Sequence, residues 1–192
     1  MKASKKDVVI LVFIAIFSAL FLSGTFSFTE EPIKEAQERL LQEALKKVMP
    51  FMEETYTLQS HTYNGVTTAI YAVEKEGVFQ GATLKLITKE GYSGEIVFLL
   101  GVDAEKKVTG IFVLKHAETP GLGAKATDIK WWGQFVGKSK PEFNFNVTKD
   151  GGQIDAITAS TITSRAIAKA VDKGLDLYED YRNSHGAELK AQ

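Results

Sequence analysis

The chain has 192 residues, of which 44% are hydrophobic and 24% charged, a composition typical of a folded domain. Its formal net charge of −1 provides no basic field, so nucleic acid is not expected as a partner. Cysteine is absent, which excludes disulfides, thiol catalysis, cysteine-ligated zinc and iron–sulfur clusters held by this chain. The length suits one membrane anchor and one domain of about 150 residues.

The N-terminal segment is strongly apolar. Residues 8–28 carry no charge, and at about 1.5 Å per residue such a segment crosses a hydrocarbon core of about 30 Å. Three lysines lie within the first six residues, so the positive-inside rule places residues 1–7 in the cytoplasm and the C-terminal domain on the extracytoplasmic side. A cleaved signal peptide has a similar basic start and apolar middle, but no clear cleavage site follows Leu22. We therefore expect a retained single-pass anchor in the inner or cytoplasmic membrane.

A connecting helix is predicted for residues 29–50. Thr29 can cap its start, acidic residues follow in the first turn, and Pro32 comes early enough to be tolerated. Apolar residues recur at helical spacing from Ile33 onward, and Pro50 should end the helix. We interpret this helix as a packing element that joins the anchor to the domain.

The folded domain is predicted to occupy residues 51–182, with a polar tail at 183–192. Four segments rich in β-branched and aromatic residues are typical of strands: 67–73, 82–88, 95–102 and 107–115. Residues 143–147 are a further strand candidate, and an amphipathic helix is predicted from Thr161 to about Tyr181. This order predicts an α+β fold, with a twisted, largely antiparallel sheet and flanking helices.

An irregular stretch separates these strands from the last helix. Glu118 to Gly123 has the sequence ETPGLG, and a proline with two nearby glycines marks a defined loop. A simple chain reversal would have the same composition. Trp131 and Trp132 follow, and buried aromatic residues there would fix the position of the loop. We interpret both as core or cofactor-wall residues.

A cluster of hydroxyl side chains precedes the last helix. It places five of them in seven positions: Thr158, Ser160, Thr161, Thr163 and Ser164. Hydroxyl groups at a helix start cap free backbone N–H groups, and those N–H groups together with the helix dipole bind phosphate. Helix capping alone would also select these residue types. The residues therefore indicate a helix start that can bind a phosphate, without choosing the ligand.

Residues 155–164, with the sequence DAITASTITS, resemble the flavinylation motif of the FMN-binding domain family. The loop at 118–123 is similar to a second signature of that family, reinforced by GYSG at 91–94. With its apolar start and its length, the whole chain resembles the G subunits of Rnf electron-transport complexes. The resemblance implies an electron-transfer subunit of a ferredoxin:NAD oxidoreductase coupled to Na⁺ or H⁺ translocation. Its partners would be the other membrane and redox subunits, and it would not be an enzyme alone.

The resemblance also implies roles for individual residues. Thr161 would carry FMN covalently as a phosphoester, installed from FAD by a separate flavin transferase that recognises a motif including Asp155. The other four hydroxyl residues would surround the phosphate: Thr158, Ser160, Thr163 and Ser164. The flavin ring would lie against six further residues: Glu118, Thr119, Leu122, Gly123, Tyr92 and Trp132.

One departure from the family pattern falls inside the motif. The usual glycine and alanine are replaced here by Ala159 and Ser160. Both replacements are small, so access to the threonine should be kept. An alanine nevertheless disfavours the positive φ that glycine allows. The motif thus predicts attachment, although a residue that disfavours positive φ, Ala159, lies two positions before the acceptor Thr161.

Other chemistries receive less support from the residues. No metal site is expected, because His61, His116 and His185 lack metal-ligand spacing. A threonine nucleophile would need a paired base that the sequence does not specify. Two alternatives to the Rnf interpretation stay open. One is the related C subunit of the Na⁺-translocating NADH:quinone reductase, and the other is a membrane-tethered assembly module whose hydroxyl cluster only caps a helix.

Overall fold

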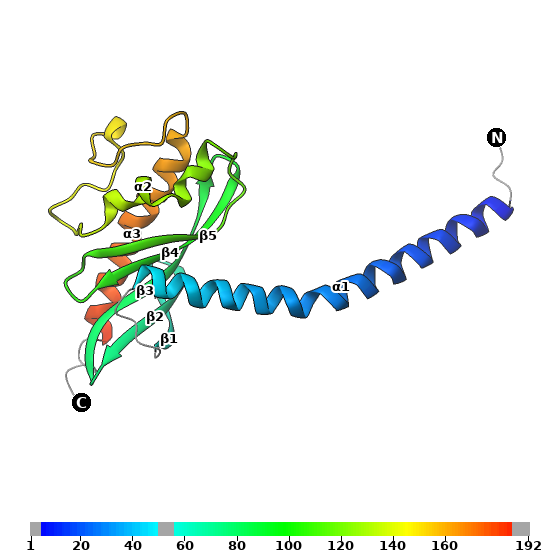
Figure 1. The fold of residues 1–192 in the computed structure, drawn as a ribbon, viewed down its shortest axis with the longest axis horizontal. Helices are drawn as coiled ribbons and strands as arrows, with labels where there is room; N and C mark the ends of the chain where they lie inside the picture. The colour runs from blue at the N-terminus through cyan, green and yellow to red at the C-terminus, as the bar shows by residue number, and fades with distance from the viewer. Residues whose placement is uncertain (1–4, 50–55, 186–192) are drawn as a thin grey trace. The chain divides into compact units, whose positions relative to one another are not determined.

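The computed structural model describes residues 5–49 and 56–185 (Figure 1). The chain divides into two compact units, Met1–Leu41 and Gln42–Gln192. The predicted segment boundaries at residues 28, 50 and 182 stay predictions. The predicted polar tail is described only as far as residue 185, and its remainder lies outside the described residues.

The first element is one long helix, α1 (Lys5–Val48). No separate helix begins at Thr29, so that prediction was wrong. The Thr29 hydroxyl donates instead to the carbonyl oxygens of Thr25 and Phe26, at 2.9 and 3.2 Å, one turn earlier in the same helix. Pro32 lies inside this helix, which ends at Val48 as expected. Judged by length and composition alone, the helix can cross a membrane, but a signal sequence near the N-terminus would meet the same criterion.

Five antiparallel strands form a single sheet in chain order. They are β1 (Thr57–Tyr63), β2 (Val66–Lys75), β3 (Val78–Gly91), β4 (Gly94–Asp103) and β5 (Val108–Lys115). The sheet and its helices confirm the predicted α+β fold, and the four predicted strands correspond to β2 to β5. Strand β1 was not predicted, because it lies at the sheet edge and carries mainly polar residues that show no alternating apolar pattern.

Between β5 and the last helix, the chain forms only short helical turns. These are η1 (Gly123–Thr127), α2 (Ile129–Trp132), η2 (Gly133–Phe135) and η3 (Thr148–Asp150). The strand predicted at 143–147 is absent from this described region, where Val147 makes only an isolated bridge to Ile154. Asn144 explains the difference, since its side-chain oxygen accepts the backbone N–H of Asn146 at 3.0 Å and competes with strand pairing.

The last helix, α3 (Thr161–His185), begins at the predicted residue and covers one face of the sheet (Figure 1). Gly174 permits the close approach, because a Cβ there would lie 2.6 Å from Cδ1 of Leu86 in β3. Near the other end of α3, the buried Tyr178 donates its hydroxyl to the Asp103 carbonyl oxygen at 2.6 Å. Burial raises the pKa of this phenol. These contacts fix the helix, and with it the position of Thr161 relative to the sheet.

The opposite face of the sheet contacts the last turn of α1 within the unit Gln42–Gln192. Gly101 of β4 and Gly110 of β5 are paired across the strands and leave room for the backbone of Val48. A Cβ on Gly101 would lie 2.4 Å from the Val48 carbonyl oxygen. That oxygen accepts the Thr109 hydroxyl at 2.5 Å. The domain therefore includes the end of α1 as part of its packing.

Candidate functional site

A buried carboxylate joins three segments that are distant in the sequence. Glu118 follows β5 and is only 5% exposed. Its Oε1 accepts the backbone N–H of Ser93 at 3.0 Å, in the turn between β3 and β4. Its Oε2 accepts the hydroxyl of Thr163 at 2.6 Å, in the first turn of α3. Burial of a carboxylate is tolerated where such donors replace water, so Glu118 holds the two segments together.

Two glycines make room for this carboxylate. A Cβ on Gly123 would lie 2.3 Å from Glu118 Oε2, and a Cβ on Gly91 would lie 2.8 Å from Oε1. Any side chain at either position would displace the carboxylate. His116 also contacts this region, because its Nδ1 accepts the backbone N–H of Glu118 at 3.1 Å. One glycine of each loop motif, Gly91 and Gly123, is thus explained by the carboxylate that it contacts.

The five clustered hydroxyl residues fall into an inner and an outer group. Thr163 and Ser164 are fully buried, and Ser160 is 8% exposed. The Ser164 hydroxyl accepts the N–H of Ile157 at 2.9 Å and donates to the Ser160 carbonyl oxygen at 3.0 Å. Together with the Thr163 contact to the carboxylate, these bonds give two of the three inner hydroxyl groups, those of Thr163 and Ser164, partners within the protein.

The outer group consists of Thr158, which is exposed, and Thr161, which is half-buried. The Thr161 hydroxyl oxygen accepts a hydrogen bond from the Lys149 ammonium group, with Nζ and Oγ1 at 3.2 Å. Thr161 is also the first residue of α3, where backbone N–H groups have no acceptor within the helix. The predicted acceptor threonine therefore lies at a positively polarised helix end with a cationic side chain beside it.

The turn into α3 has the positive φ that an alanine disfavours. Ala159 has a φ of +61°, in the left-handed region where an alanine costs about 1–2 kcal/mol. The N–H of Ser160 closes the turn by donating to the Ile157 carbonyl oxygen at 2.9 Å. The backbone therefore turns as a glycine would allow, and it does so with an alanine in place.

Aromatic and amide side chains hold the segment before the cluster. The Trp131 indole N–H donates to the Asp155 carbonyl oxygen at 2.7 Å. Gln134 Oε1 accepts the Asp155 N–H at 2.7 Å. Trp131 is buried, whereas Trp132 is half-buried and donates to the Thr127 carbonyl oxygen at 3.3 Å. Trp131 and Gln134 thus fix the backbone of Asp155, while its side chain stays exposed.

Exposed apolar side chains accompany each segment that Glu118 connects. Tyr92 is 70% exposed and adjoins Ser93, Leu122 is 42% exposed and adjoins Gly123, and Ile162 is 49% exposed and adjoins Thr163. Thr119 is also exposed. Sequence reasoning missed Ile162 and Lys149. The sequence signal for Ile162 is that it is the one apolar residue among the hydroxyl residues at 160–164.

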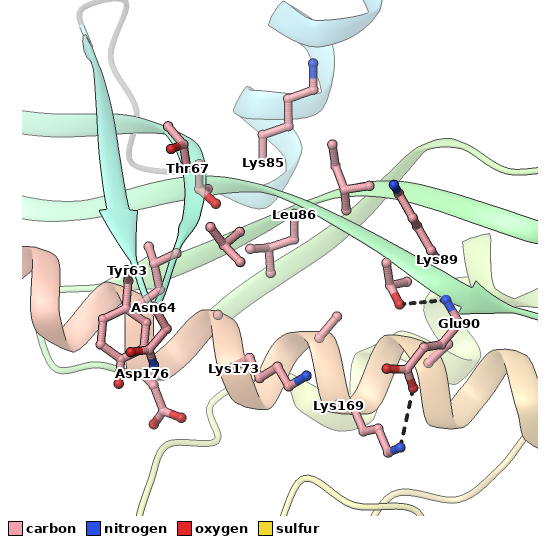
Figure 2. A pocket seen from close by; sticks show the side chains of 18 residues that line it. Tyr63, Asn64, Thr67, Lys85, Leu86, Lys89, Glu90, Lys169, Lys173 and Asp176 are labelled. Carbon is pink, nitrogen blue, oxygen red and sulfur yellow. Dashed lines mark hydrogen bonds and ion pairs between the residues drawn. The ribbon is translucent and has the colours of Figure 1, made fainter.

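A separate cavity of about 530 Å³ lies between α3 and strands β2 and β3 (Figure 2). Leu86, Ala170 and Gly174 contribute to its apolar lining, and Lys169 is paired across it with Glu90 at 3.4 Å. None of the predicted site residues lines this cavity. The predicted site is instead a surface formed by loops and the start of α3.

The chain is similar in sequence to a known domain family and to known proteins. Residues 91–176 match the family described as FMN-binding domain, and every predicted site residue lies within that segment. The chain is 35% identical to the G subunit of the ion-translocating oxidoreductase complex of Aliivibrio fischeri strain MJ11, over 93% of this chain and 91% of that protein.

Two further similarities cover less of the chain or are more distant. The chain is 42% identical over 115 residues to the G subunit of the Na(+)-translocating ferredoxin:NAD(+) oxidoreductase complex of Acetobacterium woodii, which is 58% of this chain and 55% of that protein. A crystal structure of NqrC from Shewanella oneidensis is 19% identical with a TM-score of 0.48, and the similarity covers 74% of this chain and 72% of the other.

Proposed function

Because this chain belongs to the family of G subunits of ion-translocating oxidoreductase complexes, we propose that it is a membrane-anchored flavoprotein that relays electrons between partner subunits. The proposed complex is of the Rnf type, a ferredoxin:NAD oxidoreductase coupled to Na⁺ or H⁺ translocation. Support comes from the similarity along 93% of the chain and from the match to an FMN-binding domain. Bound FMN would supply one- and two-electron transfer, and the protein would supply position and electrostatics.

The observation that carries this proposal is the environment of Thr161. Its hydroxyl oxygen lies 3.2 Å from Lys149 Nζ at the start of the 25-residue helix α3. Free N–H groups, the helix dipole and an ammonium group all favour a negative charge there. These surroundings fit a phosphate, so we propose that FMN is esterified to Thr161. Thr158, Ser160, Thr163 and Ser164 would then form the hydroxyl-rich turn around it, the last two through their internal hydrogen bonds.

The proposed surface for the flavin ring is the group of exposed residues beside the Glu118 contacts. Tyr92, Leu122 and Ile162 are apolar and exposed, and covering such side chains is favourable at about 25 cal/mol per Å² of buried apolar surface. The rest of the predicted wall would be Thr119, Gly123 and Trp132. Glu118 would act by holding these segments in place.

The membrane arrangement proposed here follows from the first segment of the chain. Helix α1 would anchor the protein as a single pass, and the lysines before the apolar segment would keep the N-terminus cytoplasmic. The domain would then face the extracytoplasmic side, where a covalent bond prevents loss of the carrier. A flavin transferase is the partner required for maturation, and the other membrane and redox subunits are the partners in electron transfer.

Intact mass of the full chain tests this proposal after co-expression with a flavin transferase. The wild-type chain should gain the mass of one FMN less one water, and Thr161→Ala should gain none. Thr161→Ser should keep the modification, because it retains a hydroxyl at the same place. Thr57→Ala serves as the matched control, since it removes an exposed threonine hydroxyl in β1, outside the motif, and should be modified like the wild type.

The outcome that contradicts the proposal is an unmodified wild-type chain in cells whose transferase modifies another substrate. Modification that persists in Thr161→Ala would instead assign the attachment to a different residue. A flavin that is bound without any mass increment would support the FMN site but not the phosphoester.

A further inference from the structure

We propose that Lys149 is the residue that positions Thr161 for attachment and then neutralises the phosphate. This inference rests on the FMN attachment proposed above and adds a role for a residue outside the hydroxyl cluster. Lys149 lies twelve residues before Thr161, and no sequence motif used above includes it.

The contact between the two side chains has a defined direction. A lysine ammonium group has three donors and no acceptor, so Nζ donates and the Thr161 oxygen accepts at 3.2 Å. The hydroxyl proton of Thr161 is consequently not used in this contact and stays available to a base. The arrangement therefore leaves the threonine oxygen hydrogen-bonded to a cation while its own proton can leave.

The turn that carries Lys149 is held in place by contacts that do not involve Thr161. This turn, η3, is tied to α3 by Asp150, whose two carboxylate oxygens accept Nε and Nη2 of Arg165 at 2.5 and 2.8 Å. This paired geometry lowers the pKa of Asp150 and raises that of Arg165. The turn is also held through the Thr148 N–H, which donates to the carbonyl oxygen of the buried Ile154 at 2.8 Å.

The attachment chemistry generates negative charge where Lys149 lies. Thr161 Oγ1 forms a bond to the phosphorus of the FMN half of FAD, and the bond between the two phosphates of FAD breaks. AMP leaves, the hydroxyl proton of Thr161 is transferred to a base and then to solvent or the leaving group, and no electron is exchanged. The threonine oxygen becomes more negative as its proton leaves, and the product phosphodiester carries a negative charge on its free phosphoryl oxygens. An ammonium group held at the oxygen stabilises both.

The test measures the rate at which the full chain in detergent is modified by a purified flavin transferase with FAD, followed by intact mass. Lys149→Ala should reduce kcat about tenfold, the effect expected for loss of one hydrogen bond to a charged group, with KM for the chain little changed. Lys149→Arg should recover most of the rate, because it restores the cation. Lys173→Ala is the matched control, since it removes the same charge about 18 Å further along α3.

Each result bears on the inference. Equal kcat for Lys149→Ala, Lys173→Ala and the wild type would overturn it, and so would a change confined to KM, which would indicate recognition by the transferase. Thermal unfolding of each variant separates a misfolded chain from a slow one, and recovery by Lys149→Arg would support the role of charge even if Lys149→Ala unfolds. An unmodified wild-type chain would contradict the attachment itself, and the role of Lys149 would fall with it.

Discussion

Thr161 and Thr163 lie two residues apart in the first turn of α3, yet they belong to different environments. Thr163 is fully buried and donates to the carboxylate of Glu118, whereas Thr161 is half-buried and accepts from Lys149. Residues two apart on a helix face in different directions, so one turn presents one hydroxyl to the interior and another to the surface. The cluster of hydroxyl residues thus divides into buried residues that stabilise the turn and accessible residues that are available for chemistry.

The substitution expected to destabilise the buried contacts of Thr163 most is Glu118→Ala. It removes the acceptor of Ser93 N–H and of Thr163 Oγ1, and it leaves the buried Thr163 hydroxyl without a partner, whereas Ser93 is exposed. We expect a loss of about 3 kcal/mol in the free energy of unfolding, because an unsatisfied buried group costs about 1–3 kcal/mol and the tie to the Ser93 turn is lost as well. Urea denaturation of the full chain in detergent measures this. Glu142→Ala, at an exposed residue, should change stability by less than about 0.5 kcal/mol, and an equal loss in both variants would contradict the role of Glu118.

A second comparison places Ser164→Ala beside Thr158→Ala. The first substitution removes both hydrogen bonds of a buried hydroxyl and leaves the Ile157 N–H without its acceptor, so about 2 kcal/mol of stability should be lost. The second removes an exposed hydroxyl and should cost less than about 0.5 kcal/mol. The same urea titration measures both. Equal values would show that the division between inner and outer hydroxyl groups has no energetic meaning.

The smallest effect is expected for Ala159→Gly, which should stabilise the chain. Relief of the left-handed conformation at φ +61° is worth about 1–2 kcal/mol, and the added flexibility of the unfolded chain offsets about 0.4–1 kcal/mol. A net gain of about 0.5 kcal/mol follows from these two effects. Ala117→Gly, at an exposed residue outside the positive-φ set, is the control and should lower stability. A destabilising Ala159→Gly would contradict the strain attributed to this turn.

Local patterns allowed part of this structure to be predicted. The start of α3 at Thr161 was predicted because a run of hydroxyl residues before an amphipathic stretch is a local signal, and it is confirmed. Strands β2 to β5 were predicted from their β-branched residues, whereas the polar edge strand β1 lacked that pattern. The break expected at Thr29 was wrong, because a hydroxyl that can cap a helix can equally bond back within one.

Contacts between distant segments account for what the sequence could not predict about the candidate site. Glu118 was expected near the flavin, but its partners Ser93 and Thr163 lie 25 and 45 residues away. The Lys149 contact with Thr161 likewise depends on how the Asp150 turn folds back onto α3. No periodicity records which buried carboxylate meets which donor, because that pairing is set by the packing of whole segments.

The crowding around Gly123 has a consequence for how such chains can diverge. A methyl group at this position would lie 2.3 Å from the Glu118 carboxylate and 2.8 Å from the Thr163 hydroxyl. Gly123, Glu118 and Thr163 therefore cannot be substituted independently, since a change at one position alters which residues fit at the other two. Substitutions in direct contact are also not additive in their effect on stability. Natural variation here should be epistatic, with replacement of the glycine accepted only in lineages whose acidic or hydroxyl partner has already changed.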